Sequence, residues 1–172
     1  MKTLYLLRHA KSSWSAPALD DVDRPLNGRG REAAAAMGAY CREHRIKPDV
    51  VLCSAAARAR ETLDVLDRAR GESAPARFQK SLYLASPSRM LAALRALDDR
   101  YSSAMLVGHE PDIRRLALDL VGGGAPRALR RLNEKFPTGA LAVLTFKVDR
   151  WQTIEAGEGH LEAFVRPRDL AD

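Results

Sequence analysis

The sequence predicts an α/β fold with a mostly parallel central sheet and an antiparallel hairpin near the C-terminus. Three short apolar runs, at residues 3–7, 49–53 and 104–107, have the length and bulk of buried strands. Stretches with helical character lie between them, and this alternation is typical of strand–helix–strand units in a parallel sheet. A hairpin is predicted over residues 140–147 and 151–155, because only a short turn separates these two segments.

The predicted helices have ordinary start and stop signals. Ser54 is expected to cap the N-terminus of the second helix, which ends near Gly71. Ser86 followed by Pro87 marks the start of the third helix, because proline fits the first turn. The helices are predicted at residues 30–44, 55–69, 88–98 and 112–121.

The composition of the 172-residue chain predicts a single globular domain, residues 1–172. Hydrophobic residues make up 46% and charged residues 29%, which excludes the disordered and fibrous classes. No apolar run approaches the ~20 residues of a transmembrane helix, and the apolar run at the N-terminus is too short for a signal peptide. We therefore expect a cytoplasmic protein. Its net charge of +6 attracts anions such as phosphate esters, phosphoproteins or nucleic acid.

The two cysteines, Cys41 and Cys53, fit no zinc or redox motif, and two thiols do not form a disulfide framework. Cys53 lies in an apolar run and is expected to be a small core residue. The chain also lacks the GxxxxGK[ST] loop that binds nucleotide phosphates. No metal and no other cofactor are expected.

Each buried strand ends abruptly in polar residues. The first is followed by Arg8 and His9, and the third by His109. The second ends at Ser54, with Arg58 one helical turn later. In an open parallel sheet the carboxyl ends of the strands share one edge, and ligands bind in the crevice there. These arginines and histidines, which are distant in sequence, are therefore expected to be neighbours in space.

Taken singly, each of these residues has an ordinary structural explanation. Arg8 and His9 could be solvated where a strand meets a loop, and His109 could be a capping or core residue. Arg58 and Arg60 cannot share a helix face, so only one of them points to the site. Together, two histidines and two arginines at one sheet edge form a site for a phosphate-like dianion. One histidine could attack phosphorus while the other donates a hydrogen bond to the developing charge.

Three ordered motifs resemble those of the histidine phosphatase superfamily, also called the phosphoglycerate-mutase-like family. Residues 7–12, Leu-Arg-His-Ala-Lys-Ser, resemble its Arg-His signature. Residues 54–62 are similar to its second arginine motif, and residues 107–111, Val-Gly-His-Glu-Pro, to its second histidine motif. The short chain and residues 23–30 are most similar to the SixA-like phosphohistidine phosphatase branch.

This resemblance implies a three-layer α/β/α sandwich, which agrees with the strand pattern. It also implies a two-step reaction in which His9 attacks the phosphoryl group, becomes a phosphohistidine intermediate and is then released by water. Arg8, Arg58 and His109 would bind the phosphoryl oxygens and stabilise the transition state.

One departure from the superfamily's pattern concerns the proton donor. Many members carry an acidic residue after the second strand, whereas residues 79–84 here contain no carboxylate. An alkoxide leaving group needs that proton, but imidazole, whose conjugate acid has a pKa of about 6.5, needs far less help. The missing acid points toward a P–N bond or an activated ester. Asp20, Asp23 and Glu110 are candidate substitutes, although for Asp23 a salt bridge or turn contact near Arg24 is the favoured alternative.

Other candidates lie outside these motifs or at their edges. Lys11 and Ser12 follow His9 and are expected either to touch substrate or to be solvated. Trp14 is expected either to line the pocket or to cover the core. Two groups are expected away from the strand ends: the histidines His44 and His160, and a basic cluster formed by Arg127, Arg130 and Arg131. That cluster is either a solvated face or a docking aid for an acidic phosphoprotein.

The leading hypothesis is a metal-independent phosphatase for phosphohistidine in a phosphoprotein, such as a phosphotransfer-type domain. The alternatives are a small-molecule phosphomonoesterase of the same superfamily and a non-catalytic phosphate or nucleic-acid binding protein. Aromatic residues make up only 6% and no nucleic-acid motif is recognised, so no nucleic-acid partner is expected. No membrane partner is expected either, and the protein is predicted to be a monomer or weak dimer.

Overall fold

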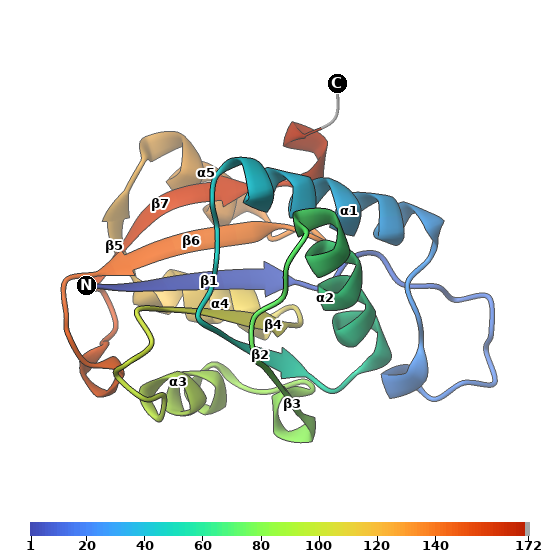
Figure 1. Ribbon diagram of the computed structural model, residues 1–172, viewed down its shortest axis with the longest axis horizontal. Coiled ribbons are helices and arrows are strands. Elements are labelled where there is room, and N and C mark those ends of the chain that lie inside the picture. The colour runs from blue at the N-terminus through green and yellow to red at the C-terminus, as the bar shows by residue number, and fades with distance from the viewer. Residues whose placement is uncertain (171–172) are drawn as a thin grey trace.

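A seven-stranded sheet forms the centre of the molecule in the computed structural model, which describes residues 1–170 (Figure 1). Its strands are β1 Lys2–Arg8, β2 Val50–Ser54, β3 Ala76–Gln79, β4 Ser103–Gly108, β5 Val121–Gly124, β6 Leu141–Phe146 and β7 Gly159–Val165. They are ordered β3-β2-β4-β1-β6-β7-β5 across the sheet. β6 is antiparallel to its neighbours β1 and β7, and every other neighbouring pair is parallel. The mostly parallel α/β fold is therefore confirmed, with β1, β2 and β4 as its three predicted buried strands.

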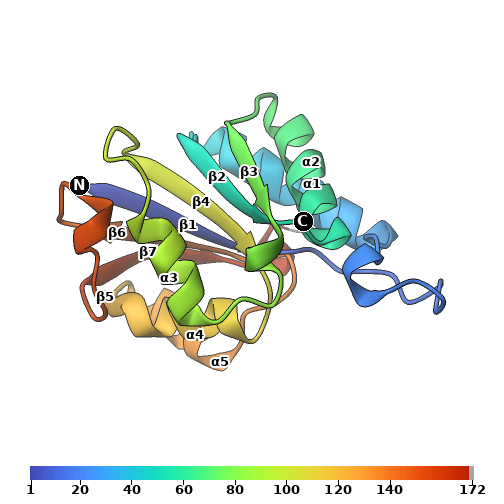
Figure 2. The same ribbon diagram turned by 90° about the horizontal axis from the view of Figure 1, so that it is seen from below.

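Helices cover both faces of this sheet. Within residues 1–170 the α-helices are α1 Gly28–Glu43, α2 Ala57–Arg70, α3 Pro87–Arg95, α4 Asp112–Leu120 and α5 Pro126–Glu134. α1 and α2 lie on one face, and α3, α4 and α5 lie on the other (Figure 2). This is the three-layer α/β/α sandwich that was expected. Among residues 1–170, none of the helices has the length and hydrophobicity of a transmembrane segment.

The central strands are apolar without interruption, which fits a sheet that is covered by helices on both faces. In β1, Leu4 and Leu6 belong to the core beneath α3, α4 and α5, whereas Leu7 belongs to the core beneath α1 and α2. Successive side chains of a strand point to opposite faces, so each face receives its own apolar set. Each fully buried leucine stabilises the fold by about 1.5–3 kcal/mol relative to an exposed one.

The pairing of the central strands positions their carboxyl ends. In the parallel pair β1–β4, Arg8 lies opposite Gly108, and in the pair β2–β4, Cys53 lies opposite Val107. The backbone N–H of His9 donates a hydrogen bond to the carbonyl oxygen of Gly108 at 3.2 Å. The three strands therefore end at nearly the same level, and the residues that follow them meet at one edge of the sheet.

The predicted hairpin is only partly correct. β6 is its first strand, but its second strand is β7, which begins at Gly159, and not residues 151–155. Trp151–Thr153 forms a short 3₁₀ turn instead, in which Trp151 is fully buried and its indole N–H donates to the carbonyl of Tyr101 at 2.8 Å. The apolar residues Trp151 and Ile154 belong to a capping segment of the core, which is why a strand prediction failed there.

The prediction of Ser54 as a helix N-cap is wrong. Ser54 is the last residue of β2 and pairs with Gln79 of β3, while Ala56 occupies the N-cap position of α2. Other boundary signals are confirmed: Gly71 ends α2 in the left-handed conformation, and Ser86 accepts a hydrogen bond from a backbone N–H in the first turn of α3. The elements β3, β5 and α5 were not predicted.

A glycine lets α1 pack against the loop that follows β1. Asn27 caps α1, since its side-chain oxygen accepts from the backbone N–H of Gly30 at 2.8 Å. A Cβ atom on Gly30 would lie 2.1 Å from the carbonyl oxygen of Lys11. The close approach requires glycine at position 30, and the backbone N–H of Asn27 donates to the same carbonyl at 3.0 Å, which joins the start of α1 to the loop after His9.

Replacing this glycine tests the packing. We expect Gly30→Ala to reduce the free energy of unfolding by about 2–3 kcal/mol, because the clash is with backbone and cannot be relieved by a side-chain rotation. Gly28→Ala is the matched control, since nothing lies within 4 Å of its would-be Cβ. Urea denaturation of both variants measures the difference, and equal stability of the two would contradict this packing.

Candidate active site

The structure brings Arg8, His9, Arg58 and His109 together at the carboxyl edge of the sheet. Arg8 ends β1, His9 and His109 directly follow β1 and β4, and Arg58 lies in the first turn of α2. The centroids of the two imidazole rings are 5.2 Å apart. All four residues line one hollow of about 350 Å³. His9, Arg58 and His109 are only 7%, 4% and 5% exposed, so the site is largely shielded from solvent.

His9 has the protonation state of a nucleophile. Its Nδ1 lies 2.7 Å from the carbonyl oxygen of Ala10. A carbonyl oxygen can only accept, so Nδ1 carries the proton and Nε2 keeps its lone pair. Burial lowers the pKa of His9 to about 3, and the nearby charges of Arg8 and Arg58 and a protonated His109 would act in the same direction. His9 is therefore neutral at physiological pH.

His109 is oriented by Ser54. The Nε2 of His109 lies 2.8 Å from Ser54 Oγ, and that oxygen already accepts the backbone N–H of Ala56 at 3.2 Å. The hydroxyl hydrogen of Ser54 can donate to Nε2, and in that tautomer the imidazole proton is on Nδ1. Burial, followed by the positive charge of Arg58, lowers the pKa of His109 to about 4. In this tautomer the neutral imidazole of His109 can donate through Nδ1.

The site holds most of the buried side-chain donors that lack a partner within residues 1–170. Nη1 of Arg8 donates to the carbonyl of Phe136 at 2.9 Å, and Nη1 of Arg58 donates to the backbone carbonyl of Asp21 at 2.8 Å. Within residues 1–170, four buried side-chain nitrogen or oxygen atoms lack a hydrogen-bond partner. Three of them are Arg8 Nε, Arg58 Nε and His109 Nδ1, and the fourth is on Arg70, away from the hollow. Because buried donors normally find acceptors, this concentration is the signature of an anion site.

Asp21 and Tyr83 belong to the site but were not predicted. The carboxylate of Asp21 accepts from Arg58 Nη2 at 3.1 Å, from Arg24 Nε at 3.1 Å and from the Tyr83 hydroxyl. The edge of the Tyr83 ring packs on His109, with centroids 5.5 Å apart. The Tyr83 hydrogen bond is the main reason that the pKa of Asp21 is lowered. Asp21 thus stays ionised and holds Arg58 in place.

The residues on the loop after His9 lie at the hollow. Lys11, Ser12 and Trp14 line it, which is the pocket-lining alternative for Trp14. Substrate contact by Lys11 and Ser12 stays a prediction. Arg24, Leu84 and Thr138 also line the hollow and were not predicted as site residues. Of these, Arg24 had a sequence signal, because it stands in the motif at residues 23–30.

The three carboxylates considered as proton donors differ in position. Glu110 lines the hollow, and burial raises its pKa. Its Oε1 accepts from the backbone N–H of Arg114 at 3.1 Å. Asp20 and Asp23 are exposed and do not line the hollow. The ion pair with Arg24 that was considered for Asp23 is made by Asp21 instead.

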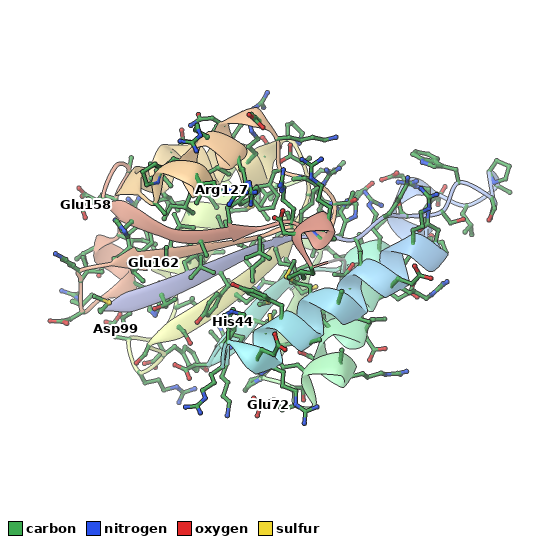
Figure 3. The ribbon with its side chains drawn as sticks, turned by 90° about the horizontal axis from the view of Figure 1, so that it is seen from above. His44, Glu72, Asp99, Arg127, Glu158 and Glu162 are labelled. Carbon is green, nitrogen blue, oxygen red and sulfur yellow. The ribbon has the colours of Figure 1, made fainter. Side chains whose placement is uncertain are left out.

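The remaining candidates lie elsewhere. His44 is exposed at the end of α1 away from the β1–α1 loop, and His160 is exposed on β7 (Figure 3). The basic cluster lies on α5, and its members Arg127, Arg130 and Arg131 do not line the hollow. Arg131 pairs with Asp169 at 3.3 Å, which gives this part of the cluster a structural contact.

Known proteins with the same architecture identify the family. Residues 4–83 match the model of the histidine phosphatase superfamily (branch 1). A structure of a proposed phosphohistidine phosphatase SixA from Nakamurella multipartitia has 32% identity and a TM-score of 0.82, and the match covers 96% of each chain. The chain belongs to the histidine phosphatase superfamily.

Two further relatives of this histidine phosphatase match over nearly its full length. An uncharacterized protein of Mycobacterium leprae is 39% identical over 166 residues, which cover 94% of this chain and 100% of the relative. A proposed phosphohistidine phosphatase SixA from Agrobacterium tumefaciens is 32% identical, with a TM-score of 0.81, and the match covers 96% of this chain and 98% of that one. The similarity to these relatives in sequence and in fold therefore extends beyond the matched motifs to nearly the whole chain.

The protonation states in the site can be measured directly. We expect an NMR pH titration to show the imidazoles of His9 and His109 neutral down to pH values below 5, because burial lowers their pKa values to about 3 and about 4. Spectra of His9→Ala and His109→Ala assign the two signals. The unfolded chain binds protons at these positions below about pH 6.5 whereas the folded one does not, so stability also falls as the pH drops below that value. Titration of either ring near 6.5 would contradict this environment.

Proposed function

We propose that this histidine phosphatase hydrolyses the P–N bond of phosphohistidine in a phosphoprotein, through a phosphoenzyme intermediate on His9. The observation that carries the proposal is the set of three unpartnered buried donors, Arg8 Nε, Arg58 Nε and His109 Nδ1, beside an imidazole whose Nε2 is free. Solved relatives at 32% identity are proposed phosphohistidine phosphatases, which supports the same substrate class here.

In the first step the lone pair of His9 Nε2 attacks phosphorus, and the P–N bond of the substrate breaks. The substrate imidazole, protonated before cleavage, departs as a neutral ring. The phosphoryl oxygens accept hydrogen bonds from Arg8, Arg58 and His109, and these charged or polarised donors stabilise the negative charge that builds on them. As His9 gains positive charge, its Nδ1–H bond to Ala10 O strengthens, since hydrogen bonds from charged donors are stronger than neutral ones.

In the second step a water molecule attacks the phosphorus of phospho-His9. The bond between phosphorus and Nε2 breaks, inorganic phosphate leaves, and the water loses a proton to the phosphate or to solvent. The same donors serve both steps because the phosphoryl group stays in place while its partner changes from substrate to water.

One carboxylate near the hollow, Asp21, is poorly suited to protonate a leaving group. Asp21 is the carboxylate held by Tyr83 and Arg58, and its lowered pKa makes it a poor proton donor. A substrate that departs as neutral imidazole does not need such a donor, whereas an alkoxide does. This favours phosphohistidine over an ordinary phosphate ester.

The cytoplasmic location and the monomeric or weakly dimeric state remain predictions from the sequence.

Replacing the nucleophile tests the proposal. We expect His9→Ala to lower the turnover of a histidine-phosphorylated protein by about 10⁴-fold or more, because the variant lacks the imidazole that is proposed to form the phosphoenzyme. Wild-type protein quenched in alkali should carry an acid-labile phosphoryl group that His9→Ala lacks. Activity should persist in excess EDTA, because guanidinium and imidazole donors bind the phosphoryl oxygens. His44→Ala, an exposed histidine far from the hollow, is the control. Full activity of His9→Ala would refute the mechanism.

A second candidate function, a small-molecule phosphomonoesterase, is favoured by one observation. Glu110 lines the hollow, and its raised pKa would help it to protonate an alkoxide.

Glu110→Gln separates the two functions. If the phosphohistidine proposal holds, this variant keeps its turnover of phosphohistidine within about threefold, because the leaving imidazole needs no acid. A phosphomonoesterase would instead hydrolyse sugar phosphates faster than phosphohistidine and lose about 100-fold in the variant. Steady-state kinetics with both substrates decide between them, and the second pattern would overturn the phosphohistidine proposal.

A further inference from the structure

Two of the residues that line the catalytic hollow, Trp14 and Leu84, are exposed apolar side chains. Among residues 1–170 the exposed large hydrophobic residues are Met1, Trp14, Leu19, Phe78 and Leu84. Three of them, Trp14, Leu19 and Leu84, lie at or beside the catalytic hollow, and we call these three the apolar rim. Trp14 is 76% exposed. Exposed apolar groups gathered at one place mark a binding surface more often than isolated ones do.

The rim extends from the phosphoryl site to a second hollow beside it. Trp14 and Leu84 line the hollow that contains His9, and Trp14 and Leu19 line an adjoining hollow of about 260 Å³. Trp14 and Arg24 line both hollows, so the two adjoin at this stacked pair. The segment between β1 and α1, which carries Trp14 and Leu19, projects beyond the rest of the molecule in both views (Figures 1 and 2). A bound phosphoprotein would therefore meet this segment first.

Trp14 is exposed but held in place. The guanidinium of Arg24 lies 3.4 Å from the centroid of the indole ring, which is a cation–π contact. Arg24 is itself bound by the carboxylate of Asp21 at 3.1 Å and by the carbonyl of Ser13 at 3.4 Å. An aromatic side chain that is fixed before binding loses little conformational entropy on contact, which is typical of binding hot spots.

Leu84 is kept at the rim in an unfavourable backbone conformation. Its φ is +53°, in the left-handed region that a branched side chain rarely adopts and that glycine adopts freely. Its side chain is 57% exposed, so packing in the core does not account for it. Strained residues of this kind concentrate at ligand sites.

We propose that the apolar rim binds an apolar side chain next to the phosphohistidine of the substrate protein, and so selects phosphoproteins over small phosphorylated molecules. This inference rests on the proposed function. A free phosphohistidine or a sugar phosphate fills the first hollow but presents no apolar group to the second. A protein surface with an apolar residue beside its phosphohistidine fills both hollows.

Two synthetic phosphohistidine peptides test the proposal. They differ only in carrying leucine or serine on both sides of the phosphohistidine, which is formed with phosphoramidate. We expect the wild-type kcat/KM to be about tenfold higher for the leucine peptide, as burial of one leucine side chain allows. Leu19→Ser and Leu84→Gly should reduce this preference to about twofold. Phe78→Ser, an exposed aromatic residue that packs on Arg60 away from the hollow, should keep it.

A loss of preference in Leu84→Gly cannot be attributed to misfolding, because glycine adopts a positive φ without strain. The midpoint of thermal unfolding of this variant should therefore not fall. No preference in the wild type, or a full preference in both rim variants, would overturn the inference while leaving phosphohistidine turnover intact. If the wild type hydrolyses a sugar phosphate but neither peptide, the proposed function fails and the inference fails with it.

Discussion

Three parallel strands that end at the same level hold the site together. Arg8 of β1 pairs with Gly108 of β4, and Val107 of β4 pairs with Cys53 of β2, so His9 and His109 are the first residues beyond adjacent strand ends. A slip of one residue in this register would turn every side chain of a strand to the opposite face of the sheet. The apolar cores on both faces forbid such a slip, and they thereby fix the distance between the two imidazoles.

Unlike the apolar core, the site contains polar groups whose burial lowers the stability of the folded protein. Two neutral imidazoles lie beside guanidinium groups, and three buried donors have no partner within the protein. Each unmet buried donor costs on the order of 1–3 kcal/mol, which the packed layers on both faces offset. In the proposed reaction a phosphoryl group would supply the missing acceptors, so the same arrangement that reduces stability would favour binding of the transition state.

The sequence predicted the features that follow from local pattern and strand order. The buried strands, the parallel sheet and the proximity of His9 to His109 came from apolar runs that end in polar residues. Asp21 and Tyr83 could not be found this way, because their contact joins a loop to a segment 62 residues away. The same holds for Trp151, whose apolar character reflects burial in the core and not a strand. Ser54 ends β2 and contacts His109 through its hydroxyl. The local pattern predicted a helix cap instead, because the contact with His109 is long-range.

A crystal structure with bound vanadate would test the donor arrangement of the site, since vanadate adopts the geometry of a phosphoryl group in transfer. We expect vanadium bonded to Nε2 of His9, with its oxygens accepting from Arg8 Nε, Arg58 Nε and His109 Nδ1. Vanadate bound elsewhere on the molecule, or bound in the hollow while those three nitrogens stay without partners, would contradict it.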